Sequence, residues 1–155
     1  LLELNSASFA IVDISTDLDG SIDFIKNLKK FDPSIMILAI ACAHHKTDML
    51  KALCAGATGY CLKEQNEEEI FNSTRITIQG GAQIDAFIAE QIMEYFNASN
   101  QIESLNKKIQ LDVRDQQILS WVIGGLDTQE IAQKLRVSKF SIESFIKLIY
   151  QKIYL

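Results

Sequence analysis

Asp13 and Lys63 carry opposite charges and end two similar apolar stretches in the front half of the sequence. Asp13 lies in "SFAIVDI" (8–14), and Lys63 ends "TGYCLK" (58–63). Short apolar stretches of this kind predict buried parallel strands, whose carboxyl ends meet at the sheet edge where ligands bind. A carboxylate facing a lysine there could accept a phosphoryl group while the lysine neutralises its charge. The other interpretation is a structural Asp–Lys ion pair.

A second group of polar residues near the end of the chain has the spacing of a nucleic-acid reader. The stretch 128–147 divides at 136–138 into two short amphipathic segments. This pattern predicts two helices with a tight turn, a common way to present a helix to the major groove of DNA. Thr128 and Gln129 begin the first segment and could contact phosphates. The polar residues that avoid the apolar stripe of the second helix are Lys139, Ser141, Glu143, Ser144, Lys147 and Lys152.

Glu143 is an unusual residue for such a surface, because a carboxylate repels phosphates. It falls outside the stripe formed by Ile142, Phe145 and Ile146, so we expect that it is not buried with them. A carboxylate can accept a hydrogen bond from cytosine N4, and Glu143 would then sharpen sequence choice. Residues 111–155 have a net charge of only +1, so we expect weak DNA binding by a monomer, which a dimer on two half-sites would strengthen.

The elements that must position these residues alternate along the front of the chain. Apolar stretches and amphipathic segments predict the order β-α-β-α-β-α, hence a parallel sheet with right-handed crossovers. The predicted elements span residues 8–14, 19–31, 34–41, 46–57, 58–63 and 66–81. One amphipathic helix is expected over 82–98, a polar link over 99–110, and helices alone over 111–155. We therefore divide the chain into 1–81, 82–110 and 111–155.

Composition narrows the class of protein. The 155 residues carry a net charge of −5 and are 48% hydrophobic, which is enough for a core. No apolar run is long enough for a membrane span, and the first residues have neither a signal peptide nor an initiating Met, as in a trimmed fragment. The cysteines, Cys42, Cys54 and Cys61, are expected to be reduced thiols of a cytoplasmic protein.

The front half resembles the receiver domain of two-component response regulators. The similarity rests on "FAIVDISTDLDG", "MILAIA", "KALCAGATGYCLK" and the acidic helix that follows. It implies a partial flavodoxin-like sheet in which Asp13 is the phosphoryl acceptor, Lys63 contacts the phosphoryl group and Tyr60 is the aromatic switch. It also implies a histidine kinase as partner, and Mg²⁺ beside Asp13 if the receiver is active.

The sequence departs from the receiver pattern at the phosphate site. Ala41 stands where the family has a Ser or Thr hydroxyl, and Thr16-Asp17 follows Asp13 in a shortened loop. The family's first strand and its acidic Mg²⁺-binding pair would come before Leu1. We therefore expect Asp13 to be a poor phosphoryl acceptor, since developing charge would lack partners.

The tail, "LDVRDQQILSWVIGGLDTQEIAQKLRVSKFSIESFIKLIYQKIYL", is similar without a gap to the LuxR-type helix-turn-helix of NarL/FixJ regulators. The resemblance implies a four-helix DNA-binding domain whose base-reading positions correspond to Glu143, Ser144 and Lys147. From the residues themselves, Asp127 with Glu130 predicts a capping box, and Ser138 predicts the cap of the next helix.

Together the two halves predict an α/β fold followed by an all-α domain. The expected function is a dimeric transcription regulator without enzymatic activity or membrane attachment, in which the receiver-like half controls dimerisation or access to double-stranded DNA. The alternative is a protein-interaction module with a degenerate receiver and weak or no DNA binding.

Overall fold

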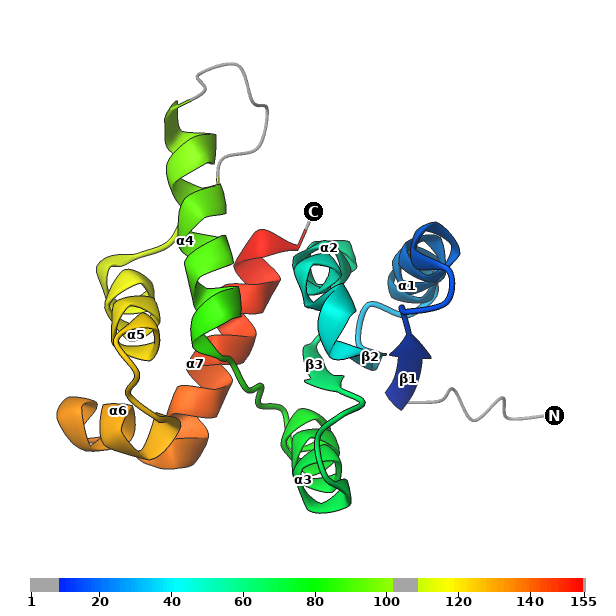
Figure 1. Ribbon diagram of the computed structural model, residues 1–155. Coiled ribbons are helices and arrows are strands. Elements are labelled where there is room, and N and C mark those ends of the chain that lie inside the picture. The colour runs from blue at the N-terminus through cyan, green and yellow to red at the C-terminus, as the bar shows by residue number, and fades with distance from the viewer. Residues whose placement is uncertain (1–8, 102–108, 155) are drawn as a thin grey trace, which may run out of the picture.

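A three-stranded parallel sheet forms the centre of the front half. The computed structural model describes residues 9–101 and 109–154. The strands β1 (Phe9–Asp13), β2 (Met36–Ala41) and β3 (Gly59–Leu62) lie in that order. Helices α1 (Leu18–Phe31) and α2 (Met49–Ala55) cover one face, and α3 (Glu67–Ile78) covers the other (Figure 1). The predicted βα order and parallel sheet are confirmed.

Local chemistry sets the ends of these helices. The side chain of Asp17 accepts a hydrogen bond from the Gly20 N–H at the start of α1, and Asn66 with Glu69 forms a capping box at the start of α3. The segment predicted to begin a helix at residue 46 is instead a 3₁₀ turn, η1 (Ala43–Asp48), before α2. Gly56 ends α2 with a φ of 120°, a conformation that favours glycine.

The helix expected over 82–98 begins later, as α4 (Ala86–Gln101). Asp85 precedes it, and the Asp85 Oδ1 atom accepts a hydrogen bond 2.9 Å from the Ile88 N–H, as a helix cap does. Residues 81–85 form no helix or strand. The periodic pattern continued through this segment, so the prediction placed the helix start too early. Part of the predicted link, 102–108, lies outside the described residues.

The helical half contains α4 with α5 (Val113–Ile123), α6 (Thr128–Leu135) and α7 (Lys139–Ile153) (Figure 1). The capping box that begins α6 and the Ser138 cap of α7 are as predicted. A further capping box, formed by Asp112 and Asp115, begins α5. Arg136 makes the tight turn between α6 and α7 with a φ of 55°. The described part of 111–155 contains three helices, α5, α6 and α7, and the expected linker helix, α4, packs against α5.

A single hydrophobic core runs through both halves. Met49 and Leu53 of α2, Ile92 of α4, and Ile146 and Ile149 of α7 are fully buried in it. The helix α2 packs against both α4 and α7, so α7 lies against the front half along part of its length. No helix in the described part of the chain is long and apolar enough to cross a membrane.

Candidate functional site

Asp13 and Lys63 meet at the carboxyl edge of the sheet, as predicted. The Lys63 Nζ atom lies 2.5 Å from the Asp13 Oδ2 atom. The other carboxylate oxygen, Oδ1, accepts hydrogen bonds from the Ser15 N–H at 2.9 Å and the Ser15 hydroxyl at 2.5 Å. The hydrogen bonds from Lys63 and Ser15 lower the pKa of Asp13 to about 2. Asp13 is therefore a firmly ionised carboxylate at neutral pH.

The surroundings of this pair offer little else for phosphoryl transfer. Ala41 is fully buried, and its backbone carbonyl accepts a hydrogen bond 2.9 Å from the Lys63 N–H. No three His, Cys, Asp or Glu side chains gather as a metal site among the residues that the structure describes. One carboxylate already paired with a lysine does not by itself provide the oxygen ligands that Mg²⁺ takes. Mg²⁺ at Asp13 and the acceptor role of Asp13 stay predictions.

Tyr60 points inward and connects the sheet to α4. Its side chain is buried, and its hydroxyl oxygen accepts a hydrogen bond 3.0 Å from the Asp85 N–H. Burial raises the pKa of Tyr60, so the phenol is neutral. The Asp85 carboxylate also pairs with Lys46 at 2.9 Å. Tyr60 thus holds the start of α4, which leaves its predicted switching role untested.

The segment 79–85 is held by both halves of the molecule, and we name it the connecting segment. From α3, the Ser73 hydroxyl donates to the Gln83 side-chain oxygen at 2.6 Å. From α7, the Tyr150 hydroxyl donates to the Gln83 carbonyl at 2.5 Å. The Ala82 N–H donates to the Glu143 carbonyl at 3.0 Å. The connecting segment therefore runs directly against α7.

Glu143 corrects an expectation from the sequence. Its side chain is buried, with 7% of its surface exposed, whereas we expected it on an open polar face. A Cβ atom added to Gly81 would lie only 2.8 Å from the Glu143 Cβ, which shows how closely the connecting segment covers this residue. Burial raises the pKa of Glu143. The prediction was wrong because periodicity describes the faces of one helix and not a distant segment that covers it.

The other predicted DNA-facing residues divide between open and covered positions. Lys139 and Gln129 are exposed, and Thr128, Ser141 and Ser144 are half-buried. Lys152 is engaged within the helical half, because its ammonium group pairs with the buried Asp115 and, at 3.4 Å, with Asp112. Within the described part of the chain, all eight predicted residues lie on α6 or α7, and Lys152 is the one engaged in a structural ion pair.

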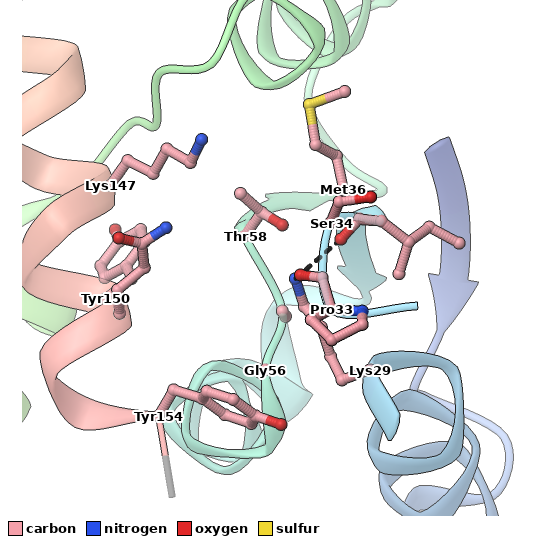
Figure 2. A pocket seen from close by; sticks show the side chains of 12 residues that line it. Lys29, Pro33, Ser34, Met36, Gly56, Thr58, Lys147, Tyr150 and Tyr154 are labelled. Carbon is pink, nitrogen blue, oxygen red and sulfur yellow. Dashed lines mark hydrogen bonds between the residues drawn. The ribbon is translucent and has the colours of Figure 1, made fainter. Parts of the chain in front are cut away.

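Lys147 lines a cavity of about 270 Å³ between the two halves. Figure 2 shows its side chain extending from α7 toward Thr58, while Lys29 of α1 borders the cavity from the front half. Sequence reasoning missed this site, since Lys29 and Lys147 are far apart in the chain and belong to separately predicted parts. No local motif marks such a cavity.

Comparisons with known proteins find relatives of this chain among bacterial regulatory proteins. Residues 110–155 match the model of the luxR family of bacterial regulatory proteins. The transcriptional regulatory protein LnrK of Bacillus subtilis is 23% identical over 92% of this chain and 68% of its own length. The fimbriae Z protein of Escherichia coli K12 is 23% identical over 98% of this chain and 70% of its own length. The crystal structure of the response regulator ChrA superposes with a TM-score of 0.45 at 22% identity, covering 94% of this chain and 68% of that one.

Proposed function

We propose that this chain is a DNA-binding transcription regulator of the response-regulator type, since residues 110–155 form a luxR-family domain. The observation that carries the proposal is the matched segment itself, which folds into α5, α6 and α7 with a capped start to each helix. Two helices joined at the left-handed Arg136 have the arrangement in which the second helix enters the major groove. The relative LnrK, named as a transcriptional regulatory protein, supports the same role.

On this proposal, residues 1–81 are the receiver-like part, 82–110 the link and 111–155 the DNA-binding part. The base-reading face of α7 would contain Glu143, Ser144 and Lys147, with Lys139 at its exposed start and Thr128 and Gln129 on the phosphates. The described arrangement is closed, because the connecting segment covers Glu143 and the front half faces Lys147. A helix covered in this way cannot enter a groove, so α7 must separate from the front half before it binds DNA.

The role is regulatory rather than enzymatic. A net charge of +1 on 111–155 supplies few phosphate contacts, so we propose a homodimer that binds two half-sites. A chromosomal target places the protein in the cytoplasm, where a histidine kinase is the partner expected for an active receiver.

Selection from a random double-stranded DNA library tests the function directly. The chain is incubated with the library at low salt, bound DNA is recovered, and the selection is repeated with Lys139→Gln and Lys147→Gln. We expect enrichment of one sequence family by the wild type and weaker or altered enrichment by the variants. Recovery of DNA without any preferred sequence, or no recovery, would instead support a protein-interaction module.

A further inference from the structure

We propose that the cavity between α1 and α7 binds a small phosphate monoester that holds the two halves together. The cavity lies where α7 meets the front half, and its lining comes from both sides (Figure 2). Lys29, Pro33 and Met36 belong to the front half, whereas Lys147 and Tyr150 belong to α7. A ligand in this position contacts both halves at once.

The charge of the lining selects an anion. Two lysines, Lys29 and Lys147, line the cavity, and no described lining residue is acidic. This concentration of positive charge stands out in a chain with a net charge of −5. Ammonium groups bind phosphate as point charges, and two of them match the double negative charge of a phosphate monoester.

The ammonium groups of both lysines have N–H groups available to donate hydrogen bonds to a ligand. The Lys29 Nζ atom donates to the carbonyls of Pro33 at 3.2 Å and Ile35 at 2.7 Å, which leaves one of its three N–H groups. The Lys147 ammonium group has no hydrogen-bond or ion-pair partner among residues 9–101 and 109–154. Burial, followed by repulsion from Lys147, lowers the pKa of Lys29, and a bound anion would relieve that repulsion.

The remainder of the lining fits the organic part of an ester. A volume of about 270 Å³ approaches that of sites for small organic ligands and leaves room beyond a phosphate group. Pro33, Ile35 and Met36 present apolar surface, and the Tyr154 ring lies against Gly56 at the edge of the cavity. The site therefore favours a phosphate with a small apolar or ring-shaped body over inorganic phosphate.

Occupancy would favour the closed arrangement. A ligand that touches Lys29 and Lys147 together binds the closed state and loses its contacts with Lys147 and Tyr150 when α7 moves away. Reciprocal coupling then requires that the ligand weakens DNA binding and that DNA weakens ligand binding. This consequence rests on the proposed DNA-binding function, whereas binding of the ligand itself does not.

Calorimetric titration of the full chain without DNA tests the site. Phenyl phosphate, inorganic phosphate and phenol are compared at constant ionic strength, and phenyl phosphate is expected to bind most tightly. Lys147→Met removes one charge without removing any described partner, so it should weaken binding at least about tenfold, the equivalent of one charge-assisted hydrogen bond. Lys29→Met should do the same, and Lys30→Met, an exposed position on the same helix, should bind as the wild type does.

The outcomes separate the site from the proposed function. Equal binding by the wild type and Lys147→Met, or no binding of either phosphate, would overturn the site. A second titration measures DNA binding with and without phenyl phosphate, and the ligand should weaken it in the wild type and in Lys30→Met. Ligand binding that depends on Lys147, in a chain that selects no DNA sequence, would support the site while contradicting the DNA-binding function.

Discussion

The backbone N–H of Ala82 donates a hydrogen bond to the carbonyl of Glu143, 3.0 Å away, and so fixes the connecting segment across the N-terminal part of α7. Glu143 lies where the LuxR-type resemblance places base recognition. The same contact therefore stabilises the closed arrangement and covers the surface that DNA would need. A substitution that weakens this contact should therefore favour DNA binding, and one that strengthens it should oppose DNA binding.

Gly81→Ala should raise DNA affinity. The added Cβ would lie 2.8 Å from the Glu143 Cβ, a contact made only in the closed arrangement. Its 3.2 Å contact with the Ile76 Cγ2 of α3 lies within the front half and is present in both arrangements. Overpacking of this kind costs roughly 1–3 kcal/mol, so binding should tighten roughly fivefold or more if opening limits affinity. Fluorescence anisotropy with a selected DNA measures the change. Gly124→Ala, whose Cβ would meet nothing closer than 3.4 Å, is the matched control, and equal affinities for both variants would contradict the closed state.

Lys147→Ala and Lys152→Ala should have different effects, although both remove a lysine from α7. Lys147→Ala should weaken DNA binding by roughly 1–3 kcal/mol if Lys147 makes a bidentate base contact, with little loss of stability. Lys152→Ala leaves the buried Asp115 without its cation and should cost roughly 1–3 kcal/mol of unfolding free energy. Urea unfolding combined with DNA titration separates the two effects. A stable Lys152→Ala that has lost DNA binding would move Lys152 into the interface.

Asp13→Asn should make stability less sensitive to acid. Because the pKa of Asp13 is lowered from 3.8 to about 2, the ionised form favours folding above pH 3.8, and this contribution is lost as the pH falls toward 2. The Asn variant should be less stable at pH 7 and show a flatter profile between these values. Thermal unfolding at several pH values measures the stability of the wild type and of Asp13→Asn, with Asp19→Asn as an exposed control on α1. Parallel pH profiles for the wild type and Asp13→Asn would show that the ion pair with Lys63 contributes nothing.

Acetyl phosphate with Mg²⁺ should label this chain poorly. Ala41 offers no hydroxyl beside the Asp13–Lys63 pair, so one oxygen of a transferred phosphoryl group would lack a donor. Phosphate-affinity electrophoresis measures the labelled fraction. Ala41→Thr tests the reason, because a restored hydroxyl should increase labelling if space permits. Stoichiometric labelling of the wild type that disappears in Asp13→Asn would show that the native pair is sufficient.

Local patterns in the sequence predicted the elements well where the determining residues are neighbours. The caps at Asp127 and Ser138 followed from such local side-chain chemistry. The meeting of Asp13 with Lys63, which are fifty positions apart, followed instead from the common direction of parallel strands. The burial of Glu143 could not be predicted, since it depends on a segment more than fifty positions earlier in the chain returning across α7. The cavity at Lys29 and Lys147 depends on the same long-range docking, which periodicity within one helix does not encode.

We infer that the face of α7 covered by the connecting segment is the face that binds DNA. A reversible disulfide between the connecting segment and α7 tests this inference. Gly81 and Glu143 lie close enough for two cysteines at these positions to be joined after a small adjustment. The double variant Gly81→Cys with Glu143→Cys is prepared oxidised and reduced, with each single variant as a control for the lost side chains. We expect that the oxidised chain does not bind the selected DNA, and that dithiothreitol restores binding to the level of the Glu143→Cys control. Equal DNA binding by the oxidised and reduced chains would contradict it.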